Sequence, residues 1–208
     1  MESQIEATDF DYGSGELCLD FSNTLDWHTS DHPGERLPDF NALVSWGEGA
    51  GILASEKASG LRQLASQQPD QAKAVYERAI QLREAVYGIF SHRYYQDPIQ
   101  PADLQFLNAT LSRSLPHLQV VSSPEGYIWE WRDDSGELDQ VTWPVVRSAA
   151  ELLTSDYLER VRVCEDDRGC GYLFVDNTRN HSRRWCSMES CGNRAKARRH
   201  YARQRISP

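Results

Sequence analysis

Four cysteines close together constrain the fold of the C-terminal part of this chain more than any other feature of the sequence. Cys164, Cys170, Cys186 and Cys191 lie within 28 residues and are separated by five, 15 and four residues. In a chain without a secretory signal, such clustering is typical of metal ligands rather than of disulfides. Four thiolates supply the closed tetrahedral shell that zinc prefers in structural sites. We therefore predict one zinc ion (Zn2+) per chain at these cysteines, with two disulfides or four unrelated thiols as the alternatives.

Glycines beside the cysteines agree with this prediction. Gly169 and Gly171 flank Cys170, and Gly192 follows Cys191, so the backbone can form tight knuckles that each present two sulfurs to one ion. Residues 172–175 predict a short strand between the two cysteine pairs. A segment of about 45 residues buries little core, and a metal ion can take its place. His181 is expected in an exposed loop, and loss of Cys186 is expected to unfold this segment and spare the rest.

The two parts of the chain carry opposite net charges. Residues 160–208 contain twelve Lys or Arg and five Asp or Glu, which gives +7. Subtracting these from the totals of 22 and 31 leaves ten basic and 26 acidic residues in residues 1–159, which gives −16. A basic segment beside an acidic body points to a polyanionic partner, and we expect DNA. The alternative is that the acidic body only keeps the protein in solution.

A basic helix is expected after the last cysteine. Residues 192–205 are rich in Ala, Arg, Lys and Gln, which favour helix, and Asn193 is a suitable N-cap. Ala195 and Ala202 can face the cysteines, which leaves the charged side chains to solvent. The predicted nucleic-acid contacts lie in this helix and in the loop before Cys186: Arg183, Arg184, Arg194, Lys196, Arg198, Arg199, Arg203 and Arg205. The alternative is a protein-interaction module, in which the zinc is structural and the basic helix docks on an acidic surface of its own or another subunit.

The part before residue 160 is predicted to be rich in helix. Asp39 can cap a helix, residues 55–65 suggest a second one, and residues 70–91 carry apolar side chains at helical spacing. Thr142 can cap a further helix. Alternating apolar side chains over residues 15–21 predict a short strand. Residues 118–122 and 127–132 predict a β-hairpin.

These elements predict an α+β fold in two parts, because the composition changes near residue 160. Residues 1–159 form a helix-rich N-terminal domain with a short strand and a β-hairpin. Residues 160–208 form a small zinc finger built of cysteine knuckles and ending in the basic helix.

Polar groups gather just after the predicted strand, and Trp27 and Trp46 are placed to line a pocket beside them. We therefore hypothesise a site for a small-molecule effector at Asn23, Thr24 and His28. The alternative is that Asn23 and Thr24 cap the strand and Asp20 bonds to the backbone.

The sequence has no nucleophile elbow, phosphate-binding loop or HExxH motif, so we expect a protein that is not an enzyme. No apolar run approaches the ~20 residues that span a bilayer, so no membrane association is expected. The acidic N-terminus lacks the apolar segment of a secretory signal, which makes the cytoplasm the expected location. Because one short helix binds DNA weakly, we expect a homodimer.

Two stretches resemble known families. Residues 183–194 read RRWCSMESCGNR and resemble the signature of CGNR zinc-finger proteins, and Asp176, Arg179 and Asn180 are similar to that family's linker. Residues 17–24, LCLDFSNT, are similar to the opening of the ABATE domain, which commonly precedes this finger, as are Leu43, Trp46, Gly51 and Leu53. The resemblance implies a bacterial, stress-related transcription regulator with zinc on the four cysteines. It also implies that Gly192, Asn193 and Arg194 begin the basic helix.

Overall fold

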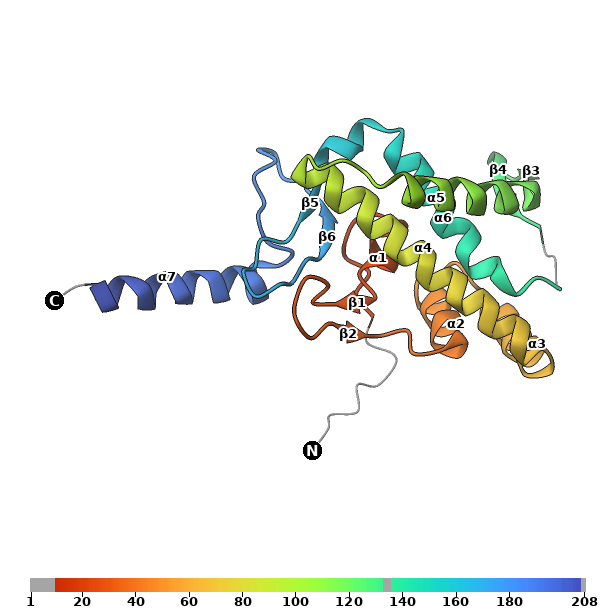
Figure 1. Cartoon of the computed structure of the whole chain (residues 1–208). Helices are drawn as coiled ribbons and strands as arrows, with labels where there is room; N and C mark the ends of the chain where they lie inside the picture. The colour runs from red at the N-terminus through yellow and green to blue at the C-terminus, as the bar shows by residue number, and fades with distance from the viewer. Residues whose placement is uncertain (1–9, 133–135, 207–208) are drawn as a thin grey trace.

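The structure, a computed structural model, describes residues 10–132 and 136–206, with side chains as far as residue 201. Within this part of the chain, helices dominate and the strands form separate antiparallel pairs (Figure 1). The helices are α1 (Leu17–Ser22), α2 (Phe40–Gly49), α3 (Ser55–Gln67), α4 (Pro69–Tyr95), α5 (Pro101–Ser114), α6 (Thr142–Leu153) and α7 (Asn193–Ile206). The strand pairs are β1 (Leu25–Asp26) with β2 (Gly34–Glu35), β3 (Leu118–Ser123) with β4 (Gly126–Trp131), and β5 (Val161–Val163) with β6 (Leu173–Val175). The predicted helix-rich α+β class is confirmed.

The long helix α4 runs through the middle of the molecule and packs against α1, α2 and α5 (Figure 1). Its apolar face is the one that the helical spacing predicts, and every member is buried: Val75, Ala79, Leu82, Val86 and Ile89. Burying a side chain the size of Val, Leu or Ile stabilises a fold by about 1.5–3 kcal/mol. This face therefore anchors the N-terminal part of the chain.

The strand predicted over residues 15–21 is wrong, because this segment forms α1. Consecutive residues from Cys18 to Ser22 are buried, so the short helix has no exposed polar face. It lies between α4, α6 and β6, which cover its sides. An apolar run that is buried on all sides has the same appearance in sequence whether it is helix or strand. Only its surroundings distinguish the two.

Two of the predicted local features are present and one differs. Asp39 caps α2, since its Oδ1 accepts a hydrogen bond from the backbone N–H of Ala42 at 2.8 Å. The β3–β4 hairpin has a regular register in which Val120 faces Trp129. Thr142 is not an N-cap, because a 3-10 turn over Leu138–Val141 leads directly into α6. The Thr142 hydroxyl instead donates to the carbonyl of Asp139 at 2.7 Å.

The β5–β6 pair belongs to the same hydrophobic core as the helices. Val161, Val163, Leu173 and Val175 are buried in one cluster with side chains of α1, α2, α4 and α6. Helix α7 follows from the cysteine-rich segment and projects away from the rest of the chain (Figure 1). The cysteine-rich segment is therefore held against the helical body, while most of its last helix is free of it.

Candidate metal centre and nucleic-acid interface

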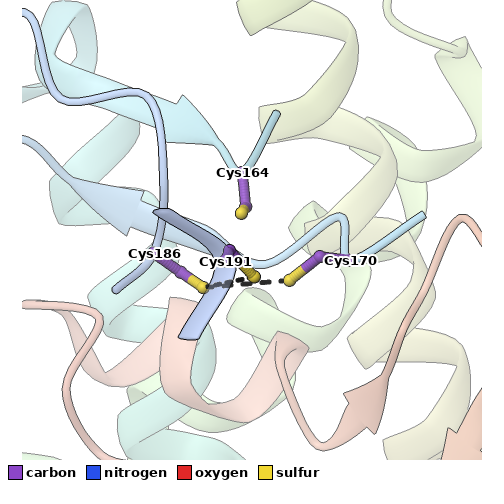
Figure 2. Close-up of side chains that lie close together, drawn as sticks. All are labelled: Cys164, Cys170, Cys186 and Cys191. Atoms are coloured by element: carbon purple, nitrogen blue, oxygen red, sulfur yellow. Dashed lines mark hydrogen bonds between the residues drawn. The ribbon is translucent and has the colours of Figure 1, made fainter. Parts of the chain in front are cut away.

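The four clustered cysteines come from four different local structures and meet at one point. Cys164 follows β5, Cys170 precedes β6, Cys186 lies in the following loop, and Cys191 lies in the helical turn Met188–Gly192. Figure 2 shows their side chains pointing toward a common centre. All four sulfur atoms lie within 4.8 Å of one another. No two of the cysteines form a disulfide.

The spacing of the sulfur atoms fits zinc. Zinc in a tetrahedral thiolate site has Zn–S bonds of about 2.3 Å, which places its sulfurs about 3.8 Å apart. Here the sulfurs of Cys170 and Cys186 are 3.8 Å apart and those of Cys186 and Cys191 are 3.6 Å apart. Hydrogen bonds from Cys170 and Cys186 lower the pKa of Cys164, while the pKa values of Cys170, Cys186 and Cys191 are raised, so binding of zinc would have to displace protons from these thiols. The four cysteines can therefore hold one zinc ion, as the sequence predicts.

The first knuckle is pressed against the loop that follows α1. The backbone N–H of His28 donates to the carbonyl of Cys170 at 3.1 Å, and that of Thr29 donates to Gly169 at 3.2 Å. Gly169 has a φ of +89°, and a Cβ built on it would lie 2.6 Å from Cα of Ser30. Only glycine fits this position, because both the backbone conformation and the space exclude a side chain.

The helix after the last cysteine begins earlier than predicted. Asn193 is not its N-cap; the Ser187 side chain accepts a hydrogen bond from the N–H of Glu189 at 3.1 Å and caps the turn Met188–Gly192. That turn continues into α7 without a break, so Cys191 is itself part of the helical segment. A bound zinc ion therefore fixes the start of α7 directly. Ala195 is buried against the finger, as predicted, and His181 is exposed in a loop.

Comparison with protein families agrees with this architecture. A family model named ABATE, described as "Putative stress-induced transcription regulator", matches residues 15–156. The chain belongs to the ABATE family. A second model, the CGNR zinc finger, matches residues 160–204 and includes all four cysteines. The ABATE domain below means residues 15–156, and the CGNR finger means residues 160–204.

The remaining comparisons add little to this assignment. A search of the curated proteins finds no match. In the described part of the chain, no helix is both long enough and apolar enough to cross a membrane.

A buried carboxylate organises the basic residues next to the zinc site. The side chain of Asp166 has no exposed surface and accepts hydrogen bonds from Arg168, Arg194 and Arg198. Burial alone would raise the pKa of Asp166, but hydrogen bonds, those from Arg168 foremost, outweigh it and lower the pKa to about 2. Asp167 forms a further ion pair with Arg198. Two of the predicted DNA contacts, Arg194 and Arg198, are thus partly exposed but paired with acidic residues of the CGNR finger.

Arg194 has two further partners. Its Nη2 donates to the sulfur of Cys191 at 2.8 Å. Its guanidinium group lies 5.2 Å from the ring centre of Trp27 in the ABATE domain, and that of Arg168 lies 5.0 Å from the same ring. A positive charge beside four thiolates offsets part of their negative charge. Arg194 therefore supports the metal site and joins it to the ABATE domain.

Arg183 is also part of the scaffold of the finger. Its Nε donates to the carbonyl of Trp185 at 2.9 Å, its Nη2 bonds to the carbonyl of Cys186, and its guanidinium group lies 4.4 Å from the ring centre of Phe174. Arg184 lies at the surface and pairs with Glu165 at 2.6 Å. Of the eight predicted nucleic-acid contacts, Lys196 and Arg199 are exposed on α7. The side chains of Arg203 and Arg205 lie outside the described residues.

Of the residues of the predicted effector site, Asn23 and Thr24 are buried and His28 is partly exposed. Asn23 bonds to the backbone of Leu173 in the finger, and the Thr24 hydroxyl donates to the carbonyl of Phe21 at 2.7 Å. The ring of His28 stacks on Tyr87, with centres 3.3 Å apart, and its Nε2 lies 3.0 Å from Glu84. The backbone bonds of the alternative are present, since Asp20 also accepts one from the N–H of Ser14 at 2.9 Å, but Asn23 caps helix α1 and not a strand. The three residues connect the ABATE domain to the finger.

The two tryptophans predicted to line a pocket differ in exposure, since Trp27 is only partly buried. Trp46 is fully buried, and Trp27 contacts the two arginines. The sequence did not indicate Asp166 as a site residue, nor the contact of Trp27 with Arg168 and Arg194. The cue available for Asp166 was a pair of acidic residues two positions after a cysteine; Trp27 had none, because its partners are more than 100 residues away along the chain.

Proposed function

We propose that this protein is a regulator of transcription that binds duplex DNA through α7. The observation that carries the proposal is the position and charge of this helix. It contains six Lys or Arg and no acidic residue, it starts at a zinc ligand, and it extends away from the acidic body (Figure 1). A helix of this kind can neutralise phosphates and enter a major groove.

The dimensions of α7 suit this role. Its 14 residues span about 21 Å at a rise of 1.5 Å per residue. A major groove of about 12 Å in width admits one such helix. Lys196 and Arg199 are exposed in the first two turns, whereas Ala195 is buried. These two residues are the best-placed described side chains for contacts with phosphate oxygens.

We assign the zinc ion a structural rather than a catalytic role. When bound, it would cross-link two knuckles that have little core of their own. Four thiolates fill a tetrahedral shell and leave no position for a reactive water molecule or a substrate. This supports the proposal that the protein regulates by binding and not by catalysis.

A homodimer remains part of the proposal. A single α7 offers few contacts, whereas two copies can occupy neighbouring half-sites and so increase affinity. The mass of the zinc-loaded protein in solution, measured by light scattering, tests this directly.

The second candidate function is a protein-interaction module, and the charge of the body favours it. A net charge of −16 over residues 1–159 makes another copy of the chain an electrostatically suitable partner for α7. Within one chain, the ion pairs between this helix and acidic residues are those of Arg194 and Arg198 near its start, among the described residues. DNA is the stronger candidate because the family description also points to transcription.

The test is fluorescence anisotropy with the zinc-loaded chain and a labelled mixed-sequence duplex at several salt concentrations. We expect affinity to fall steeply with salt, and the double variant Lys196→Ala/Arg199→Ala to reduce the log–log slope by about 1.8, or about 0.9 per lost phosphate contact. Lys73→Ala/Arg78→Ala in α4 is the matched control and should leave the slope unchanged. Absence of binding at low salt by zinc-loaded wild-type protein would overturn the proposed function.

A further inference from the structure

The loop between the two cysteine pairs forms one side of a surface groove of about 530 Å³. The lining residues are basic, polar or aromatic apart from one methionine, and none is acidic: Thr178, Arg179, Asn180, Ser182, Arg183, Arg184, Trp185 and Met188. A second groove of about 460 Å³ lies beside α7 and shares Arg184 and Trp185 with the first. Its other lining residues include Arg199. The two grooves are therefore neighbours that meet at Trp185.

The loop is held in one conformation by a buried carboxylate. Asp176 has no exposed surface, and its Oδ1 accepts hydrogen bonds from the backbone N–H and the hydroxyl of Thr178. Its Oδ2 accepts from the backbone N–H of Arg183 at 2.8 Å. The groove is thus bounded by fixed backbone, so a ligand would not have to order the loop when it binds.

Trp185 orients two arginines that come from different elements. The guanidinium group of Arg184, in the loop, lies 5.3 Å from the centre of the indole ring, and that of Arg199, on α7, lies 5.5 Å from it. Cation–π contact restricts the rotation of both side chains. Two guanidinium groups are therefore already in place beside Trp185, where the grooves meet.

Arg179 lines the first groove but not the second. It is exposed, and within the described part of the chain it makes no hydrogen bond or ion pair. Acidic side chains lie only at the second groove: Glu165 pairs with Arg184, and Asp167 pairs with Arg198. The first groove therefore presents positive charge that no carboxylate of its lining neutralises.

We infer that the two grooves form one track for the phosphates of a DNA strand, with Arg179 in the first groove, Arg184 shared by both and Arg199 of α7 in the second. This inference rests on the proposed function and specifies its contact surface. Guanidinium groups bind phosphate through paired hydrogen bonds, and a fixed row of them follows a backbone without reading its sequence. DNA bound by α7 would thus also contact the loop between the cysteine pairs.

The test uses the zinc-loaded full-length chain and the same labelled duplex. Arg179→Ala should weaken binding about fivefold at low salt and reduce the log–log salt slope by about 0.9. Arg78→Ala removes an arginine from the first half of α4, far from the finger, and should change neither quantity. Glu165→Gln should strengthen binding because it releases Arg184, while Glu77→Gln controls for the lost negative charge.

Trp185 is tested by two substitutions whose zinc content is measured first. Trp185→Leu keeps an apolar side chain but removes the ring, so we expect about a fivefold loss of affinity. Trp185→Phe keeps an aromatic face and should stay within about twofold of wild type.

The outcomes separate this inference from the proposed function. If wild-type protein binds DNA and Lys196→Ala/Arg199→Ala weakens binding, but Arg179→Ala behaves as Arg78→Ala does, the track is wrong and α7 remains the interface. If the wild-type protein does not bind DNA at low salt, both fail.

Discussion

The side-chain amide of Asn23, the residue that caps the C-terminal end of α1, forms two hydrogen bonds with the backbone of Leu173 in β6. Nδ2 donates to the carbonyl oxygen and Oδ1 accepts from the N–H, each at 2.8 Å. Asn23 is buried, so no water can replace these bonds. One side chain of the ABATE domain thus occupies both backbone groups of a residue in the CGNR finger.

Asn23→Ala should lower the free energy of unfolding by about 3 kcal/mol, because it leaves a buried N–H and a buried carbonyl without partners. Urea unfolding of the zinc-loaded protein measures the change. Asn41→Ala removes an exposed asparagine from α2 and should cost less than about 0.5 kcal/mol. Equal effects of the two substitutions would show that Asn23 does not join the two parts.

Removal of zinc should destabilise the whole chain and not the finger alone. From sequence, loss of Cys186 is expected to spare the N-terminal part, but β5 and β6 share the core of α1 and α4. Chelation or Cys186→Ala should therefore lower the midpoint of a single thermal transition followed by far-UV circular dichroism. Addition of zinc should reverse the effect of chelation. If the midpoint of the main transition did not change, the ABATE domain and the CGNR finger would unfold independently.

Gly169→Ala should destabilise the protein by about 3 kcal/mol or more, since its φ of +89° and its contact with Ser30 both exclude a Cβ. Gly60→Ala is a control for which the change in unfolding free energy should have the opposite sign. Gly60 lies within α3 with open space around it, so alanine should stabilise the protein by about 0.5–1 kcal/mol. Denaturant unfolding of both variants measures the difference, and a tolerated Gly169→Ala would contradict the packing of the first knuckle against residues 28–30.

Arg194→Ala should weaken zinc binding about 10- to 100-fold, because Arg194 contacts both the sulfur of Cys191 and the carboxylate of Asp166. Competition with a chromogenic chelator measures the zinc affinity. Lys196→Ala is the matched substitution two residues further along α7. It should leave zinc affinity unchanged and weaken only DNA binding. If Lys196→Ala weakened zinc binding and Arg194→Ala did not, the proposed roles of the two residues would be wrong.

Cys18 should not react with thiol reagents in the folded protein. It is fully buried, and burial raises its pKa to about 12, so the reactive thiolate is scarce near neutral pH. Ellman's reagent added to zinc-loaded protein should detect this thiol only after denaturation. Alkylation followed by peptide mapping identifies the residue, and fast labelling of Cys18 under native conditions would contradict its burial.

Several features could be predicted because they depend on residues close together in the chain. The buried face of α4, the Asp39 cap and the β3–β4 hairpin follow from local spacing and local hydrogen bonding. The zinc site could be predicted for a different reason. Four cysteines in such a short segment have few roles other than binding a metal ion. The nucleic-acid surface was harder to predict, because the sequence does not show whether a basic side chain faces solvent.

The sequence by itself determined the four cysteines, the opposite charges of the two parts and the basic character of α7. The tertiary structure alone decided that residues 17–22 are helical, that Asn23 holds Leu173, and that Arg194 turns inward to Asp166 while Lys196 stays exposed. The physical reason is that burial and pairing depend on partners far away in the chain. An arginine is drawn to the nearest buried carboxylate, and only the fold establishes which carboxylate that is.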